Sequence, residues 1–561
     1  MKQTSRTDPL RIDGIRVNTL GGEIGMTLCP GRKDITNLPG DLDRDLERDL
    51  AVIADWGATA LLSLIEPHEF EALGVAHMIQ VLPAGIAHYV LPIVDRAIPS
   101  GTWERAWATI GPQVRERLAL GERVVIHCRG GLGRTGMVAA RLLIEFGEVP
   151  ARAIRRVRAV RPGAIETRRQ EEYVLRQKLL ESILPRPHYP VDPLRLSRYR
   201  GCLLGGAVGD ALGAPVEFMD IAAIRKQFGA AGIRDFVPYA GKLGAITDDT
   251  QMTLFTAEGL LRAANRARLS GGDPDLRTGV AQAYQRWLVT QGDKSRLTPE
   301  VQSGWLIRHG ALFARRAPGI TCLTTLCKMQ RHDELAHNDS KGCGGVMRMA
   351  PVGLFVGGWE EAAPKFAQKA FDLGCQLAGI THGHPAGQHA AGVLAALIVR
   401  LLHGASLPAA LDEVRVFLKT QDHHEETLAA INLAVRLAED SGDSDNHLRQ
   451  LGQGWVAEEA LAIAVYCALR SDSFEDGVRL AVNLTGDSDS TGAIAGNLLG
   501  ALHGVEAIPL RWLVPLELRE AITAVADDLL SCPQWRIGLG PPKDNDGRRE
   551  RAYWLDRYPR E

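Results

Sequence analysis

The sequence of 561 residues contains nine cysteines, and no two of them form a close pair. Closely spaced cysteines are typical of disulfide-rich secreted domains and of structural zinc sites. Their absence favours reduced thiols, and with them a cytoplasmic protein. The first eight residues contain no apolar run, so no secretory signal is visible either.

Long apolar runs and an excess of one charge are also missing. The longest apolar stretch, Gly392 to Val399, stops at Arg400 and is too short to span a bilayer, so we expect no membrane association. A formal net charge of −2 argues against a general surface for nucleic acid. The length exceeds that of one average domain, which predicts at least two.

Prolines mark a boundary between two differently patterned regions. We interpret residues 183–197 as a semi-rigid linker, because they contain Pro185, Pro187, Pro190 and Pro193. Before it, in 1–182, strand-like runs alternate with helical ones, which predicts an α/β sandwich. After it, in 198–540, segments rich in Ala and Leu predict an all-α domain. The C-terminal tail, 541–561, begins with charged residues and ends with Tyr553, Trp554 and Tyr558.

The most informative segment of the first domain runs from His127 to Gly136 and reads HCRGGLGRTG. A β-branched run precedes it and an apolar helical pattern follows, so the loop lies at a helix N-terminus. Its glycines allow backbone N–H groups to surround an oxyanion, and the helix dipole adds to the attraction. The same field stabilises a thiolate at Cys128, and Arg134 can bind two phosphate oxygens. The segment therefore predicts a phosphate site that contains a nucleophile.

This segment resembles the signature loop of the protein tyrosine and dual-specificity phosphatases. Residues 91–99, LPIVDRAIP, resemble the general-acid loop of that family, and 161–170, RPGAIETRRQ, resemble the loop whose Gln helps to position the hydrolytic water. Together with GGEIGMTLCPG at 21–31, the spacing is most similar to the kinase-associated phosphatase subgroup.

The resemblance implies a two-step reaction without a metal. Cys128 attacks phosphorus to give a cysteinyl-phosphate while Asp95 protonates the leaving oxygen, and Asp95 then deprotonates the hydrolytic water. The other expected catalytic residues are Arg134, Thr135 and Gln170. The residues expected to bind the phosphate are Arg129, Gly130, Gly131 and Gly133.

Two acidic clusters stand out in the second domain, TDDTQ at 247–251 and GDSDSTG at 486–492. Each opens a helical pattern and offers carboxylate and hydroxyl oxygens, which suit Mg²⁺ or Mn²⁺ better than zinc. Either cluster alone is also a good helix cap. Two matching clusters far apart in sequence indicate one dinuclear site.

The clusters belong to a longer series of motifs that includes GCLLGGAVGDALGAPVEF at 201–218, GCGGVMRMAP at 342–351 and THGHP at 381–385. The series resembles the ADP-ribosylglycohydrolase family, which includes the dinitrogenase-reductase-activating glycohydrolases. The resemblance covers nearly the whole second domain in the order found in the family. It implies an all-helical fold, two Mg²⁺ or Mn²⁺ ions, and cleavage of the bond from the distal ribose of ADP-ribose to a protein side chain or small leaving group.

Carried over by position, this resemblance assigns roles to individual residues. Glu217 matches a base or water-orienting residue, and Asp210 has a structural role. The metal ligands are Thr247, Asp248, Asp249, Asp487, Asp489 and Ser490, with Thr491 as an alternative source of the hydroxyl. The turn expected to bind ADP-ribose contains Gly344, Gly345 and Met347.

The sequence therefore predicts a bifunctional hydrolase. Its expected substrates are an ADP-ribosylated protein or ADP-ribose conjugate, and a phosphorylated protein or small phosphate ester. Two alternatives stay open: one domain catalyses and the other only targets it, or both domains bind modified partners through inert sites. The acceptor that carries the ADP-ribose also stays open.

Overall fold

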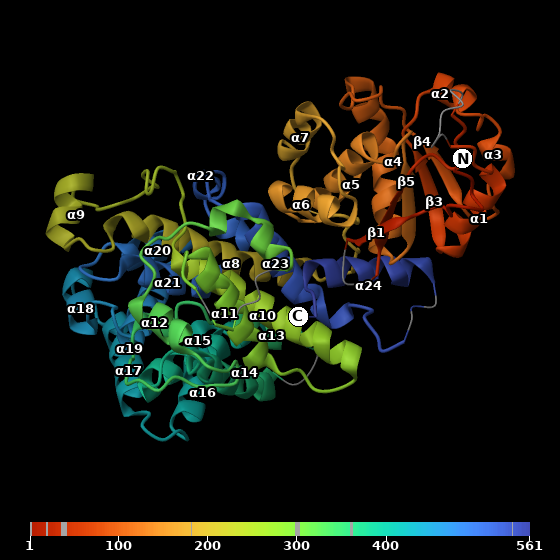
Figure 1. Cartoon of the computed structure of the whole chain (residues 1–561). Helices are drawn as coiled ribbons and strands as arrows, with labels where there is room; N and C mark the ends of the chain where they lie inside the picture. Colours follow the sequence, from red (N-terminus) through yellow and green to blue (C-terminus); the bar gives the residue numbers. More distant parts are fainter. Residues whose placement is uncertain are drawn as a thin grey trace. The chain divides into compact units, whose positions relative to one another are not determined.

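The computed structural model describes residues 3–17, 21–34, 42–180, 182–294, 296–297, 303–359, 363–540, 542 and 544–560. They form two compact units, coloured along the chain in Figure 1. The first unit combines Met1–Pro187 with Gly540–Arg557, and the second combines His188–Leu539 with Tyr558–Glu561. The end of the chain is therefore divided between the two units.

A five-stranded sheet, in the order β1-β2-β5-β3-β4, forms the centre of the first unit. Strands β2, β5, β3 and β4 are parallel, and β1 is antiparallel to β2. The carboxyl ends of three strands meet, because His127 on β5 is in register with Thr27 on β2 and with Ser63 on β3. In open parallel sheets this edge is where ligands bind. The strands are β1 (Asp13–Arg16), β2 (Glu23–Thr27), β3 (Ala58–Ser63), β4 (Ala87–Val90) and β5 (Arg123–His127).

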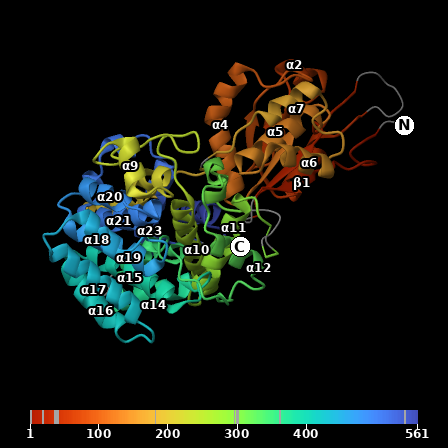
Figure 2. The same cartoon turned by 90° about the vertical axis from the view of Figure 1, so that its left-hand side faces the viewer.

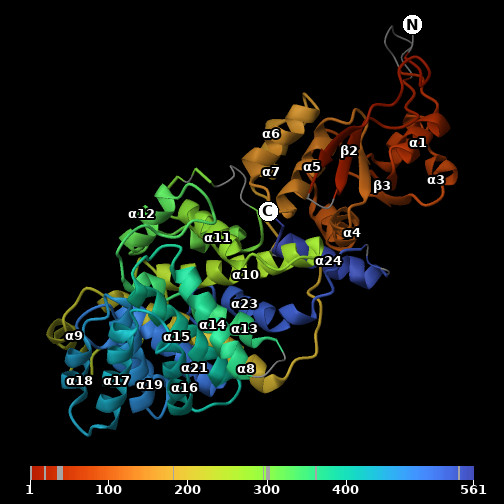
Figure 3. The same cartoon turned by 90° about the horizontal axis from the view of Figure 1, so that it is seen from below.

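Helices cover both faces of this sheet, which completes the predicted α/β sandwich. Figures 1 and 3 show α5, α6 and α7 on one side of the strands and α1 and α3 on the other. The helices of this unit are α1 (Leu46–Asp55), α2 (Pro67–Ala72), α3 (Met78–Val81), α4 (Gly101–Ala119), α5 (Gly133–Glu145), α6 (Pro150–Val160), α7 (Arg168–Leu175) and α24 (Asn545–Arg557).

Helix α24 comes from the predicted C-terminal tail and belongs to the first unit. Arg549 on this helix pairs with Glu116 on α4, and Arg548 lies 3.6 Å from Glu122. Tyr553 and Trp554 are buried. The charged sequence of the tail thus forms a helix that carries its own buried aromatic residues.

The second unit is built from helices, and its described residues contain isolated bridges but no strand. In Figure 2, α16, α17 and α18 lie at the outer side of this unit, while α15 and α19 lie deeper. Its longer helices are α8 (Pro193–Gly213), α9 (Ile221–Phe228), α10 (Asp248–Ser270), α11 (Leu276–Thr290), α12 (Ile320–Lys328), α13 (Ala350–Gly357), α14 (Ala363–Ala378), α15 (Pro385–Leu402), α16 (Leu407–Leu418), α17 (Glu425–Glu439), α18 (Ser444–Leu451), α19 (Ala457–Arg470), α20 (Phe474–Val482), α21 (Ser488–His503) and α23 (Arg519–Ser531).

Helix α8 begins at Pro193, which lies within the segment predicted as a linker. The side chain of Asp192 caps the helix. Proline is well suited to the first helical turn because a backbone N–H at that position would have no partner within the helix. Among the described residues, α15 is the one unbroken helix long and apolar enough to cross a membrane, and 83% of it is buried within the protein.

Glycines hold α8 against α21 over several turns. A Cβ atom at Gly201, Gly205 or Gly209 would overlap a backbone oxygen of α21, and glycines on α21 face α8 in the same way. Because the spacing of four residues places these glycines on one helix face, the two backbones approach closely. At the end of this contact, Gly213 lies against Ser488. The packing therefore brings the end of α8 to the beginning of α21, where the second acidic cluster starts.

Two candidate active sites

The loop from Cys128 to Leu132 connects β5 to α5 in the first unit. Cys128 is almost fully buried, and the backbone N–H of Gly131 donates to its Sγ atom at 3.2 Å. Gly131 has a φ of +72°, and a Cβ atom there would overlap the backbone of Thr27. The loop thus needs glycine at this position to aim an N–H group at the sulfur.

Arg161 supports this loop from outside. Its guanidinium donates to the carbonyl oxygens of Gly130, at 3.2 Å, and Gly131, and it forms an ion pair with Asp13 at 2.6 Å. Because Arg161 holds these two carbonyl groups on the outside of the loop, the backbone N–H groups of the loop can point toward its centre. Arg129 and Gly130, which the sequence predicts to bind phosphate, are exposed.

Arg134 is held by a carboxylate that the sequence analysis did not identify. Its two terminal nitrogens donate to Glu69 on α2 at 2.6 and 3.0 Å, and one of them lies 3.0 Å from Asp95 Oδ1. Burial raises the pKa of Glu69, but the hydrogen bonds from Arg134 and from the backbone of Glu66, together with the positive charge of Arg134, hold that pKa below its usual value. The guanidinium therefore has a fixed orientation in the loop.

The structure brings Asp95 and Gln170 to the same loop. The Asp95 side chain is 57% exposed and follows β4, whereas Gln170 is fully buried at the beginning of α7. Gln170 forms a capping box with Thr167, and a Cβ atom added to Gly133 would lie 3.0 Å from its Nε2 atom. Thr135 is buried, and its hydroxyl has no hydrogen-bond partner among the described residues.

His127 lies beneath the nucleophile and has a neutral ring. Its Nε2 atom lies 2.6 Å from Ser63 Oγ, which also contacts His88 at 2.8 Å. Burial lowers the pKa of His127 to about 3. Its Nδ1 atom lies 3.3 Å from the carbonyl oxygen of Cys128, so the residue positions the Cys128 backbone and does not accept a proton at neutral pH.

The second site lies where α10 and α21 begin, next to the end of α8. Asp210 on α8 accepts the backbone N–H groups of Thr247, at 3.0 Å, and Thr250, at 3.1 Å. It thereby satisfies the first turn of α10 and fixes the direction of that helix. This matches the structural role expected for Asp210.

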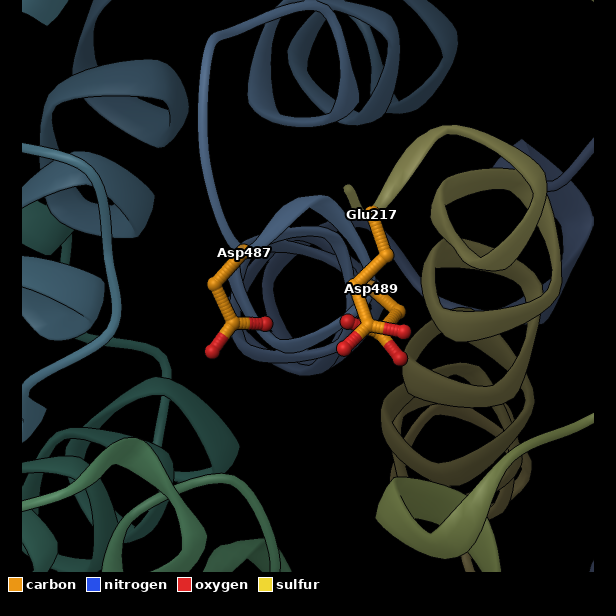
Figure 4. Close-up of side chains that lie close together, drawn as sticks. All are labelled: Glu217, Asp487 and Asp489. Atoms are coloured by element: carbon orange, nitrogen blue, oxygen red, sulfur yellow. The ribbon is translucent and has the colours of Figure 1, made fainter. Parts of the chain in front are cut away.

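Carboxylates from three segments converge at this point. Oxygen atoms of Glu217, Asp487 and Asp489 all lie within 4.8 Å of one another. Figure 4 shows these three side chains. Asp248 and Asp249 come from α10, and Asp248 accepts the N–H of Gly319 at 3.2 Å. One oxygen each of Glu217 and Asp249 is buried without a hydrogen-bond partner among the described residues. These hard oxygen atoms are suitable ligands for a divalent cation.

Burial and mutual repulsion raise the pKa values of these acids. The pKa of Glu217 and that of Asp248 each rise to about 8, first because of burial and then because of neighbouring carboxylates. The pKa values of Asp249 and Asp489 rise well above the usual range for the same reasons. Such a cluster is stable when it binds protons or cations.

The hydroxyl groups beside the cluster differ in their availability. The Thr491 hydroxyl donates to the backbone oxygens of Ala481 and Asp487, at 2.7 and 2.8 Å. Ser490 Oγ has a weak contact with the sulfur of Met347 at 3.8 Å. The Ser490 side chain also hydrogen-bonds the carboxylates of Asp249 and Asp487, so of the two hydroxyls it is the one directed at the acidic cluster.

The expected ADP-ribose turn lies against the same cluster. Cys343, which precedes Gly344 and Gly345, donates its thiol to Asp487 at 2.7 Å. Both glycines face the ring of His382, and Met347 is buried. The contact between Cys343 and Asp487 joins positions 144 residues apart and had no signal in the sequence.

Comparisons with known proteins match each unit to a family. Residues 191–537 match ADP-ribosylglycohydrolase, and residues 42–174 match a domain described as "Swiss Army Knife protein, DSP-PTPase phosphatase domain".

Individual relatives match one unit each. An uncharacterized protein of Archaeoglobus fulgidus is 30% identical over 59% of this chain and 95% of its own length. The ADP-ribosyl-[dinitrogen reductase] glycohydrolase of Rhodospirillum rubrum is 28% identical over 57% of this chain and 91% of its own. A crystal structure of kinase associated phosphatase is 24% identical, covers 30% of this chain and 93% of its own, and has a TM-score of 0.27.

Proposed function

Because the chain belongs to the ADP-ribosylglycohydrolase family and also carries a phosphatase domain, we propose two hydrolytic reactions for it. The second unit removes ADP-ribose from a modified protein or small conjugate with the help of two Mg²⁺ or Mn²⁺ ions. The first unit hydrolyses phosphomonoesters through a cysteinyl-phosphate. The observation that carries the first proposal is the buried cluster of Glu217, Asp487 and Asp489.

In the second unit, carboxylates from α10 and α21 hold the cations, together with the hydroxyls of Thr247 and Ser490. Two such ions, held by these residues, would supply Lewis-acid polarisation of the ribose hydroxyls and of a water molecule. Glu217, beside these ligands, accepts a proton from the attacking water. The glycines of the 343–345 turn allow the backbone to approach the diphosphate.

In the first unit, Arg134 and the N–H groups of the loop hold three phosphate oxygens while Cys128 Sγ forms a bond to phosphorus. The bond from phosphorus to the leaving oxygen breaks, and Asp95 gives that oxygen a proton. Gln170 then orients a water molecule, Asp95 takes its proton, and phosphate leaves Cys128. The Thr135 hydroxyl donates to the departing sulfur.

One assay tests the glycohydrolase. The protein is incubated with arginine-linked, serine-linked and small ADP-ribose conjugates, with and without Mg²⁺, and free ADP-ribose is measured. We expect release that requires the cation, persists in Cys128→Ser and is lost in Asp489→Asn. Release that Asp489→Asn leaves unchanged rules out the acidic cluster as the active site.

A further inference from the structure

A pocket of about 660 Å³ lies in the second unit beside the acidic site. Its walls come from helix α18 and from two segments, 452–456 and 483–485, that lead toward α19 and α21. Ile221, four residues after Glu217, completes one side. The volume is in the range of a binding site for a small molecule or a few side chains.

The pocket and the acidic site share a wall. The backbone N–H of Asp487 donates to Gln453 O at 2.8 Å, and the N–H of Cys343 donates to Trp455 O at 3.1 Å. Thr485 lines the pocket two residues before Asp487, so their Cα atoms are at most about 7 Å apart. The pocket therefore lies next to the segment that carries Asp487.

Most of the polar groups that line this pocket already have partners within the protein. Glu459 accepts the N–H groups of Gln453, at 2.9 Å, and Gly454, at 3.2 Å. Thr485 accepts the N–H of Ile221 at 3.0 Å, and Asn483 and Asp445 are engaged by Ile233 and Arg225. The apolar part of the lining comes from Leu448, Trp455, Val456 and Leu484.

Phe218 and Arg449 are exposed at the edge of the pocket. Phe218 is 76% exposed although it follows Glu217 directly, and its ring stacks on Trp455 with centroids 5.8 Å apart. An aromatic pair that is exposed beside a reacting centre is typical of a surface that a ligand covers. Arg449 lines the pocket from the exposed face of α18 and forms no ion pair within the described residues.

We propose that this pocket binds the acceptor protein, through an apolar side chain near the ADP-ribosylated residue and an acidic side chain next to it. The apolar group packs against Leu448 and Trp455, and the carboxylate pairs with Arg449. The acceptor is the occupant because Phe218 and Ile221 follow Glu217, the group that acts where the bond to the acceptor breaks. The inference rests on the proposed glycohydrolase activity and adds to it a preference for acceptor sequence.

The test compares two peptides that carry the same ADP-ribosylated residue, one flanked by Leu-Glu and the other by Gly-Gly, with a free ADP-ribosylated amino acid. We expect a kcat/KM at least ten times higher for the Leu-Glu peptide, since one well-packed apolar group is worth roughly 10- to 200-fold. Leu448→Ala and Arg449→Glu should each remove about tenfold of this advantage and leave hydrolysis of the free conjugate unchanged. Arg436→Glu, on the exposed side of α17, is the matched control.

Equal kcat/KM values for the two peptides, or equal losses on the peptide and on the free conjugate, would overturn the inference. If no substrate is hydrolysed, the proposed function has failed. The binding of unmodified peptides then tests whether the pocket recognises the acceptor sequence. Fluorescence anisotropy of the labelled, unmodified peptides is measured with the full chain carrying Asp489→Asn. Tighter binding of the Leu-Glu peptide that Arg449→Glu abolishes supports the pocket, and equal binding of both peptides rejects it.

Discussion

Glu69 binds both terminal nitrogens of Arg134, at 2.6 and 3.0 Å, although the two residues are 65 positions apart. Two parallel hydrogen bonds to a carboxylate fix a planar guanidinium in direction as well as in place. Both side chains are buried, so solvent does not compete for these bonds. Arg134 is therefore oriented before any phosphate enters the loop.

We predict that Glu69→Gln lowers kcat/KM for an aryl phosphate by about 10- to 100-fold, because a misplaced catalytic group costs up to about two orders of magnitude. The side chain keeps its size but loses its charge and one of its two acceptor atoms. The measurement is steady-state kinetics together with the melting temperature, which separates misalignment from unfolding. Glu71→Gln, on the exposed face of the same helix, is the control and should behave like the unmodified chain.

The nucleophile is tested with Cys128→Ser. We expect hydrolysis of the aryl phosphate to disappear in this variant and to survive EDTA in the unmodified chain. Asp95→Ala should lower the rate by roughly two to four orders of magnitude, the usual contribution of a positioned acid. An EDTA-sensitive activity that Cys128→Ser does not change would contradict the cysteinyl-phosphate mechanism.

The acidic cluster leads us to expect that a divalent cation raises the melting temperature more at higher pH. The pKa of Glu217 and that of Asp248 rise to about 8 in the fold, so their protonated forms stabilise it at low pH and this stabilisation is lost as pH rises toward 8. A cation must displace those protons, and it therefore binds better at higher pH. Millimolar Mg²⁺ or Mn²⁺ should raise the melting temperature more at about pH 8.5 than at about pH 6.

The matched variant for this experiment is Asp248→Asn, which keeps the shape of the side chain. It should remove most of the cation-dependent shift in melting temperature. A shift that is equal at both pH values, or equal in the variant, would mean that the cation binds elsewhere.

Local motifs were enough to predict which family each domain belongs to, but not the contacts that support the two candidate sites. The signature loop encodes its own geometry, because Gly131 and Arg134 act within a few residues of Cys128. Glu69 could not be found in this way, because the sequence around it is typical of the beginning of a helix. Glu69 completes the capping box that begins at Glu66. The contact of Cys343 with Asp487 also depends on tertiary packing, as does the wall that Trp455 contributes to the pocket.

We predict that His127 makes the first unit less stable in acid. Burial lowers its pKa from the ordinary value of 6.5 to about 3, so the unfolded chain binds a proton between these values and the folded chain does not. The stabilisation is present above pH 6.5 and is lost as pH falls toward 3. Between pH 8 and pH 5 this group alone should cost about 2 kcal/mol of unfolding free energy.

Denaturant unfolding at several pH values checks this prediction. His127→Gln should flatten the pH dependence of unfolding of the first unit, because glutamine does not titrate. His68→Gln, at an exposed position on α2, is the control and should keep the original slope. The same slope in both variants would mean that other groups cause the loss of stability in acid.

The last prediction concerns helix α24, which joins the first unit from the far end of the sequence. Because Arg549 and Arg548 pair with Glu116 and Glu122 of that unit, residues 1–187 alone lack part of their native contacts. We expect a protein of residues 1–187 to melt at a lower temperature than the first unit does in the full chain. A peptide of residues 540–557 added in trans should raise that temperature, since a ligand that binds the folded state stabilises it. A peptide carrying Arg549→Glu should have a weaker effect, and equal effects of the two peptides would show that these ion pairs do not hold the helix.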